Sequence, residues 1–367
     1  PAPGPSGDLF ELVAGASGLW EDDRDQAQLG GNGVAVGDIN GDELPDIYLA
    51  GNAMQWGLVR NRLYINNGDG TFAEESEARG LPPGASQDTG EEWAPVGATF
   101  ADFDNDGDPD LFLANDGPNQ LYRNDAGFFT DISAAAGLGG GAVLSVGMAL
   151  ADYDRDGHLD LFVVNHLDRT GEVEELNLVG INGDLFHNAG DGSFEQVSQL
   201  LPQPEPDGAG FVATWTDFDG DGDPDLYVAN DEGTTLQPNQ LYRNDGEDGE
   251  GGWLFTRVSD TCGCDVAMFA MGVAVGDYDR DGLQDLYVTN LAKGGGEVLL
   301  QNQGDGGYVN TSLATSAVAM LPGEREVSWG TEFLDADNDG WLDLFVAYGA
   351  LVDPGDRESF RPAANVL

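Results

Sequence analysis

The chain has 367 residues, in which 14 Lys and Arg stand against 67 Asp and Glu, a formal net charge of −53 at pH 7. Nucleic acids and anionic lipids bind through basic groups that neutralise phosphates, so this charge excludes both classes of partner. Hydrophobic residues make up 40% of the chain, which is enough apolar surface for a folded core and argues against disorder. Fifty-five glycines and 17 prolines, spread along the chain, favour an all-β protein with many tight turns.

The first residues are expected to be a short linker. Residues 1–7, PAPGPSG, have neither the charged nor the apolar region of a signal peptide. A single domain is predicted over residues 8–367, in which residues 10–19 match a strand. The longest apolar stretch, residues 142–151, is far shorter than the roughly 20 residues that cross a bilayer, so we expect no transmembrane segment.

One nine-residue pattern recurs six times from Asp38 onward. It has Asp at position 1, Asp or Asn at position 3, Asp at position 5, usually Gly at position 6, and Asp at position 9. The intervals between successive starts are 64, 50, 65, 60 and 58 residues. A repeat of this length is typical of a propeller blade. The copies lie at residues 38–46, 102–110, 152–160, 217–225, 277–285 and 335–343.

Short β-rich segments flank each copy, for example GATFAD before the second copy and DLFLAN after it, so each acidic loop is predicted to be a hairpin tip. A third segment follows, such as NQLYRN from Asn119. Its Asn, Gly and Asp residues predict a turn into a fourth strand, such as FFTDISAAAGL from Phe128. The chain is therefore predicted to be an all-β propeller of six four-stranded blades, with seven blades as the alternative.

The two ends of the chain are predicted to close this ring. Residues 365–367 match the start of a third strand, and residues 10–19 match a fourth strand. Pairing of the N-terminal strand with the C-terminal blade would remove two exposed sheet edges.

The six loops are predicted to bind up to six structural calcium ions. Calcium takes six to eight oxygen ligands at about 2.3–2.6 Å, and calcium loops supply them from alternating side chains and one backbone carbonyl. Positions 1, 3, 5 and 9 offer side chains, and position 7 offers its carbonyl whatever its side chain. Without a cation, the crowded carboxylates would repel one another. Magnesium favours smaller octahedral sites, and transition metals favour His or Cys, which these loops lack except for His158 at a carbonyl position.

Glycine at position 6 permits a positive φ, and the first loop, with Asn40 and with Glu43 in place of that glycine, is expected to be the weakest site. The predicted metal ligands are Asp38, Asn40, Asp42, Leu44 and Asp46; Asp102, Asp104, Asp106, Asp108 and Asp110; Asp152, Asp154, Asp156, His158 and Asp160; Asp217, Asp219, Asp221, Asp223 and Asp225; Asp277, Asp279, Asp281, Leu283 and Asp285; and Asp335, Asp337, Asp339, Trp341 and Asp343.

These loops and their flanking strands resemble FG-GAP (VCBS-type) repeats, as in the β-propeller of integrin α chains. Phrases such as MGVAVGDYDRDGLQDLYVTN and NQLYRN are similar to the cartilage-acidic-protein group, and the resemblance covers nearly the whole chain. It implies structural calcium between the first two strands of a blade and a ring face that serves adhesion or ligand binding. Integrin propellers have seven blades, whereas this chain has six copies of the loop.

The only two cysteines are Cys262 and Cys264, separated by one residue. A disulfide across such a short span is strained, and a pair of free thiols is a comparable interpretation, whereas a metal site on two soft ligands is less favoured. Two cysteines do not decide the compartment. The calcium loops favour an extracellular location, because cytosolic calcium is too scarce to fill weak structural sites.

The three histidines are not expected to form a catalytic site. His158 lies in an acidic loop, and His187 takes a strand position that is arginine in two sibling repeats, so both are predicted to be structural or exposed. His166 begins an insertion that is predicted to be a structural loop. The sequence has no nucleophile elbow, zinc-binding helix or phosphate-binding glycine loop.

Two further sets of residues recur on the second strands. Asparagines that follow these strands are predicted to cap the next turn, and aromatic residues on them are predicted to pack between blades. Variation that serves ligand binding is expected in the longer connections at residues 53–60, 83–95, 167–182, 231–238 and 291–296. The asparagines are Asn115, Asn165, Asn230 and Asn290, and the aromatics are Phe112, Phe162, Tyr227, Tyr287 and Phe345.

The sequence therefore predicts a secreted or cell-surface calcium-binding propeller, not an enzyme, that acts as an adhesion or binding module. Its expected partner is a protein or glycan on a loop face. Two alternatives remain open. One is a polysaccharide lyase or another sugar-active enzyme on the same scaffold, because a propeller's central pocket can host chemistry. The other is a self-assembling subunit of a surface layer, a homo-oligomer or a fibre.

Overall fold

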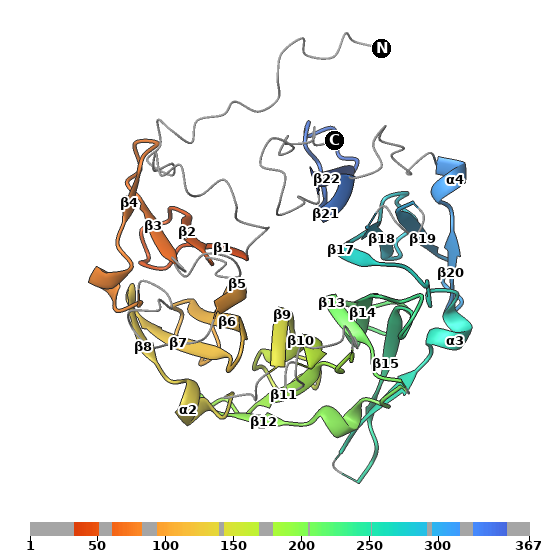
Figure 1. Ribbon diagram of the computed structural model, residues 1–367, viewed down its shortest axis with the longest axis horizontal. Coiled ribbons are helices and arrows are strands. Elements are labelled where there is room, and N and C mark those ends of the chain that lie inside the picture. The colour runs from red at the N-terminus through yellow and green to blue at the C-terminus, as the bar shows by residue number, and fades with distance from the viewer. Residues whose placement is uncertain are drawn as a thin grey trace, which may run out of the picture. The chain divides into compact units, whose positions relative to one another are not determined.

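The computed structural model describes residues 33–50, 61–82, 94–138, 143–168, 179–204, 206–250, 252–291, 296–315 and 326–350 (Figure 1). The predicted linker, the N-terminal strand at residues 10–19 and the closing residues 365–367 lie outside these ranges, so ring closure stays a prediction. The chain divides into two compact units. One contains Pro1–Asp102, Asp106–Leu113 and Gln120–Ile132, and the other contains Phe103–Asn105, Ala114–Asn119 and Ser133–Leu367.

The first unit contains two antiparallel four-stranded sets. In the first set the strands are hydrogen-bonded in chain order, and in the second set β5 pairs with β6, β6 with β7 and β7 with β8. A 3₁₀ helix, Glu77–Arg79, follows the first set. The strands are β1 (Val34–Gly37), β2 (Asp46–Leu49), β3 (Arg62–Asn66) and β4 (Phe72–Glu74), then β5 (Ala94–Ala101), β6 (Asp110–Asp116, whose last residues belong to the second unit), β7 (Gln120–Asp125) and β8 (Phe128–Asp131).

The second unit repeats the same antiparallel order three times and adds one hairpin. Its sets are β9 (Val143–Ala151), β10 (Asp160–Asp168), β11 (Asp184–Asn188) and β12 (Phe194–Gln196); β13 (Ala209–Thr216), β14 (Asp225–Asp231), β15 (Gln240–Glu247) and β16 (Trp253–Arg257); β17 (Ala270–Gly276), β18 (Asp285–Asn290), β19 (Val298–Asn302) and β20 (Tyr308–Asn310); and the hairpin of β21 (Glu326–Leu334) and β22 (Asp343–Ala350).

Short helices follow the fourth strands of these sets: α2 (Ser133–Ala136), a 3₁₀ turn (Ser198–Leu200), α3 (Ser259–Cys262) and α4 (Ser312–Thr315). Within the described ranges, no helix is long and apolar enough to cross a membrane. The all-β prediction with four strands per repeat is confirmed, and the sixth copy contributes two described strands. The total number of blades stays a prediction.

The second strands β6, β14 and β18 are buried on both faces, which explains their continuous apolar sequence, whereas Leu49 of β2 is exposed. All six residues of β18 are buried, for example. The predicted role of the recurring aromatics is confirmed for Phe162, Tyr227 and Tyr287, because each packs in a cluster with residues of the next sheet along the chain. Phe112 is fully buried, and Phe345 is partly exposed. Buried aromatics of this kind carry much of the stabilisation of a core.

Close packing between successive sheets also sets a limit on side-chain size. A Cβ atom added to Gly272 on β17 would lie 2.3 Å from the carbonyl oxygen of Trp329 on β21. Real Cβ atoms do not approach a backbone oxygen so closely, so only glycine fits there.

The recurring asparagines hold the turns between second and third strands. The side chain of Asn115 donates to the carbonyl of Pro118, at 2.6 Å, and that of Asn230 donates to the carbonyl of Pro238, at 2.7 Å. Asn165 instead donates to Asp184 at the start of β11, at 2.9 Å. The prediction that these residues cap turns is confirmed at Asn115 and Asn230.

Candidate metal centres

Each acidic loop is curled by hydrogen bonds from its own backbone to its own carboxylates. In the fourth loop, Asp217 accepts the backbone N–H of Gly220 at 2.9 Å and that of Gly222 at 3.1 Å. Asp221 accepts the N–H of Asp223 at 2.9 Å. These bonds fold the backbone around the carboxylates. The position 1 aspartate accepts the N–H of position 6 in the other five loops as well, at Glu43, Gly107, Gly157, Gly282 and Gly340.

The curl needs a left-handed backbone at two positions of every loop. Position 6 has positive φ in all six copies, including 68° at Glu43, the one residue there that is not glycine. The prediction for position 6 is therefore confirmed, and Glu43 carries the strain of a non-glycine residue in this region. Position 4 also has positive φ throughout, which was not predicted from the sequence. Its residues are Gly41, Asn105, Arg155, Gly220, Arg280 and Asn338.

The aspartate at position 9 begins the second strand and is held from two sides. Asp225, which is fully buried, accepts the N–H of Phe218 at 3.0 Å and that of Asn244 at 2.8 Å. The first bond comes from position 2 of the same loop, and the second comes from the third strand. The same pair of bonds recurs at Asp46, Asp160 and Asp285.

The resulting carboxylates converge. In the third, fourth and fifth loops, oxygens of the aspartates at positions 1, 3 and 9 all lie within 4.8 Å of one another, and such groups could hold a metal ion. The fourth and fifth loops offer only oxygen donors to this cluster. Oxygen-only clusters of carboxylates suit hard cations such as calcium or magnesium. The converging residues are Asp152, Asp154 and Asp160; Asp217, Asp219 and Asp225; and Asp277, Asp279 and Asp285.

Burial makes the position 9 carboxylates costly to ionise in the absence of a cation. Burial raises the pKa of Asp225 to about 8 and that of Asp160 to about 7, with smaller increases from neighbouring aspartates and opposing effects from the backbone hydrogen bonds. The pKa of Asp285 rises to about 6 for the same reasons. A bound cation would supply the missing positive charge and favour the ionised carboxylates. The electrostatics of the loops therefore fit a metal site.

His187, which the sequence predicts to be structural or exposed, lies on β11 beside the third loop. Its Nδ1 atom, on β11, lies 3.1 Å from Oδ2 of Asp154 and 3.3 Å from Oδ1 of Asp160. Gln301 occupies the corresponding position of β19 and donates to Asp279 at 2.5 Å. This third-strand position therefore faces the metal loop. Aligning LFHN with LLQN shows the correspondence, although not the contact.

The other two histidines contact residues of neighbouring repeats. Nδ1 of His158 lies 2.9 Å from the side-chain nitrogen of Asn105. His166 is buried, with Nδ1 3.1 Å from the carbonyl oxygen of Gly210, and burial lowers the pKa of its imidazole. Most of the insertion that follows His166 lies outside the described residues.

A second set of asparagines, on the third strands that follow the second to fifth loops, donates to the preceding loop and was not predicted from the sequence. Asn244 donates from its side chain to the carbonyl of Tyr153, at position 2 of the third loop, at 2.9 Å, and to the carbonyl of Pro224 in its own loop, at 3.3 Å. Equivalent bonds to the preceding loop are made by Asn124, Asn188 and Asn302. In the sequence, these residues are visible as the Asn that ends each of the third-strand segments LYRN, LFHN and LLQN.

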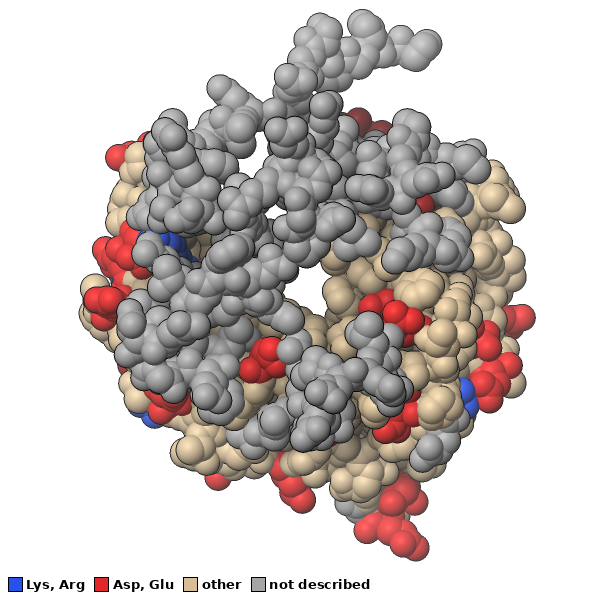
Figure 2. All heavy atoms as spheres, in the orientation of Figure 1, with Lys and Arg blue, Asp and Glu red and all other residues tan. Residues whose placement is uncertain are grey.

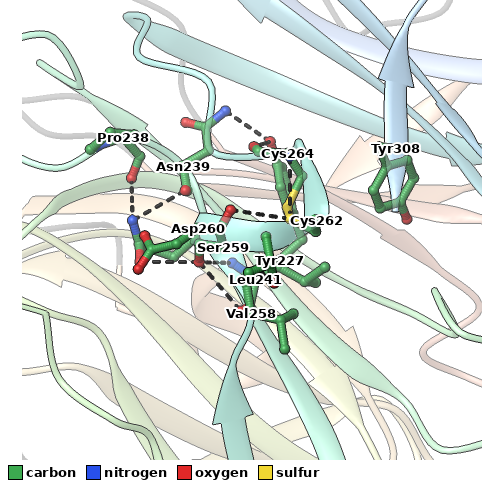
Figure 3. The surroundings of a disulfide bond; sticks show 12 residues. Tyr227, Pro238, Asn239, Leu241, Val258, Ser259, Asp260, Cys262, Cys264 and Tyr308 are labelled. Carbon is green, nitrogen blue, oxygen red and sulfur yellow. Dashed lines mark hydrogen bonds between the residues drawn. A yellow bond between two sulfur atoms is a disulfide. The ribbon is translucent and has the colours of Figure 1, made fainter. Parts of the chain in front are cut away.

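The two cysteines form a disulfide, so the structure decides between the two interpretations left open by the sequence. Cys262 ends α3, and Cys264 follows with a Cα–Cα distance of 5.3 Å (Figure 3). Both residues are buried, in a cluster that includes Tyr227 and Tyr308. The hydroxyl of Tyr227 donates to the carbonyl of Cys264 at 3.3 Å. The bond thus lies in a core, which also contains Phe218 of the fourth acidic loop.

The described surface is strongly acidic. Figure 2 shows one face, on which Asp and Glu side chains are far more frequent than Lys and Arg. This distribution agrees with the excess of 67 acidic over 14 basic residues.

Residues 38–112, 102–163, 178–228 and 217–288 match the FG-GAP-like repeat. Cartilage acidic protein 1 of Homo sapiens is 30% identical over 219 residues, which cover 58% of this chain but only 30% of that protein. The chain thus spans less than a third of the length of this relative.

Two solved structures are similar at low identity. An Agrocybe aegerita lectin, described as recognising non-reducing terminal N-acetylglucosamine, is 18% identical with a TM-score of 0.46, over 90% of this chain and 78% of the lectin. The V. cholerae biofilm matrix protein Bap1 is 16% identical with a TM-score of 0.39, over 76% of this chain and 38% of Bap1.

Proposed function

The chain belongs to the FG-GAP-like repeat family, and on this premise we propose that it is a calcium-stabilised β-propeller that binds a protein or glycan outside the cell. The proposal includes six blades in one domain over residues 8–367. The single observation that carries it is the convergence of carboxylates, one of them buried in each group, in the acidic loops. Positions 1, 3, 5 and 9 of each loop are the proposed side-chain ligands, and position 7 is the proposed carbonyl ligand.

Calcium fits the loops better than magnesium. Each loop offers four carboxylates, or three and an asparagine in the first loop, together with a backbone carbonyl, which approaches the six to eight oxygens that calcium takes. Magnesium binds fewer protein ligands and retains several waters. The aspartate at position 9 remains available to a cation because a carboxylate has about four acceptor sites and its two backbone bonds use half of them.

Two features support an extracellular location. The Cys262–Cys264 disulfide is a bond that forms and persists in oxidising compartments. Weak structural calcium sites are filled where calcium is abundant. The acidic surface would keep such a protein soluble and would disfavour binding to anionic polymers.

Binding rather than catalysis is supported by how the histidines are used. His187 contacts the third loop, His158 contacts Asn105, and His166 is buried against the backbone of Gly210. Each imidazole therefore has a structural contact. The connections between strands, such as residues 231–238, are the proposed ligand-binding face, because loops on a rigid scaffold can vary without disturbing the fold.

The calcium assignment is tested by thermal unfolding of chelator-treated protein with and without added ion. A site filled at 100 times its Kd adds about 2.7 kcal/mol of stability. We expect calcium to raise the Tm, with a larger effect than the same concentration of magnesium. An unchanged Tm in metal-free and calcium-containing buffer would refute the assignment. The binding role is tested separately on glycan and protein arrays, where capture should require calcium.

A further inference from the structure

Neighbouring acidic loops touch through two fixed positions of the nine-residue pattern. The guanidinium of Arg280, at position 4 of the fifth loop, lies over the ring of Trp341, at position 7 of the sixth, 3.9 Å from its centroid. Arg155 of the third loop forms an ion pair of 2.6 Å with Asp223 of the fourth. Asn105 lies 2.9 Å from the imidazole of His158 in the same way.

The position 4 residue is aimed at its neighbour by the curl of its own loop. Arg280 has a φ of 63°, and the next N–H, that of Asp281, bonds to Asp277 at 3.0 Å. A nitrogen of Arg280 also approaches Gly340, at position 6 of the sixth loop, to within 2.9 Å of where a Cβ atom would lie. A change in the curl of the fifth loop would therefore move Arg280 relative to the sixth.

The side chain at position 7 is the one that position 4 of the preceding loop contacts. The backbone carbonyl of position 7 is also a proposed metal ligand. The N–H of Trp341 donates to Asp339 at 2.8 Å, and Asp339 is itself a proposed ligand. Holding the Trp341 side chain thus restrains the backbone that would present the carbonyl to the ion. The contact of Arg280 with the indole therefore links the geometry of two sites.

The fourth and fifth loops are linked by a different residue, because position 4 of the fourth loop is glycine. Gln284, at position 8 of the fifth loop, accepts the N–H of Asp217 at 2.9 Å and the hydroxyl of Thr216 at 2.8 Å. From the second loop to the sixth, each consecutive pair thus has a direct contact.

We propose that neighbouring loops joined by a contact from position 4 to position 7 bind their cations cooperatively, so that an ion in one loop raises the affinity of the next. This inference rests on the proposed calcium sites. A partly exposed cation–π contact is worth about 0.5–1 kcal/mol, so the coupling between the fifth and sixth loops should change affinity by about two- to fivefold.

Trp341 allows metal binding to be measured at the sixth loop alone. Terbium replaces calcium as the probe, and an indole within a loop sensitises its luminescence. The signal that Trp341→Phe removes is assigned to the sixth loop, and the phenyl ring still offers Arg280 a partner. The full chain is titrated with terbium, with and without Asp277→Asn and Asp279→Asn, which empty the fifth loop. Arg280→Ala is then introduced into both the chain with an intact fifth loop and the chain with an emptied one, which gives four proteins to compare.

When Arg280 is present, emptying the fifth loop should raise the terbium concentration that half-saturates the Trp341 signal by about two- to fivefold. With Arg280→Ala, the same change should have little further effect. If the fifth-loop variant does not fold, Arg280→Ala alone should weaken the sixth loop, and Arg280→Lys should weaken it less.

The outcomes separate the two proposals. Equal half-saturation in all four chains would overturn the cooperativity while leaving metal binding intact. No terbium luminescence and no calcium-dependent rise in Tm would overturn the metal sites themselves, and the cooperativity with them.

Discussion

The side-chain nitrogen of Asn244 lies 2.9 Å from the backbone carbonyl oxygen of Tyr153, a residue 91 positions earlier in the chain. Asn244 is fully buried, and its side-chain oxygen also accepts the N–H of Gly246 at 3.1 Å and the indole N–H of Trp253 at 2.5 Å. One amide thus connects a third strand to its own turn and to the acidic loop of the preceding sheet.

Replacing Asn244 with alanine should destabilise the protein strongly. The change leaves the buried carbonyl of Tyr153 and the indole N–H of Trp253 without these partners, and each unsatisfied group costs about 1–3 kcal/mol. We expect a loss of about 2–5 kcal/mol in the free energy of unfolding, measured by urea denaturation. Asn67→Ala, at an exposed asparagine in a turn after β3, is the matched control and should cost about 0.5 kcal/mol or less. Similar losses for the two variants would contradict a structural role for the buried amide.

The fourth loop offers a matched pair of aspartates that distinguishes a side-chain ligand from a carbonyl ligand. Asp219 at position 3 belongs to the converging carboxylates, whereas Asp223 at position 7 is proposed to bind through its carbonyl. Asp219→Asn should lower the number of bound calcium ions by one or weaken that site by more than tenfold. Asp223→Asn should keep the number unchanged. Calorimetric titration of the chelator-treated chain measures both, and loss of an ion from the Asp223 variant alone would reverse the assignment of the two positions.

Replacing Gly272 with alanine should destabilise the protein through a steric clash that does not depend on bound metal. Its missing Cβ atom would lie 2.3 Å from the carbonyl oxygen of Trp329, so Gly272→Ala forces two sheets apart. Overpacking of this kind costs about 1–3 kcal/mol. At Gly330, on the neighbouring strand β21, an added Cβ meets nothing within 4 Å, so Gly330→Ala should change the free energy of unfolding by less than about 0.5 kcal/mol. Chemical denaturation of the two variants makes the comparison, and an unaffected Gly272→Ala protein would show that the sheets can separate at no cost.

The disulfide should resist reduction in the folded protein. Cys262 and Cys264 are 1% and 0% exposed, and a thiolate must reach a sulfur atom to break the bond. Mild reductant followed by alkylation should therefore label almost no cysteine in native protein and two per chain in denaturant, as measured by mass spectrometry. Cys262→Ser with Cys264→Ser should cost about 1–2 kcal/mol from the lost constraint on the unfolded chain, which is small because the closed loop is short. Rapid labelling of the native protein would show that the bond is accessible.

The periodic pattern of the chain predicted the fold class and indicated most of the candidate metal ligands. Strand segments of apolar residues before and after DXDXDGXXD dictate a hairpin with an acidic tip, because the strand preferences and the turn residues act within about 20 neighbouring positions. Positive φ at position 6 followed from glycine in five of the six copies, and the structure extends it to Glu43. These are local properties, so the order of residues along the chain is enough to determine them.

The contacts between repeats could not be obtained in this way. His187 and Asp154, Asn244 and Tyr153, and Arg280 and Trp341 meet only when strands fold back or successive sheets stack. Whether position 4 of one loop reaches position 7 of the next depends on the distance and twist between two sheets, which no residue encodes alone. The sequence by itself determined the hairpins and their acidic tips. The tertiary structure decided which tips touch, because packing between sheets brings together residues that are more than 50 positions apart.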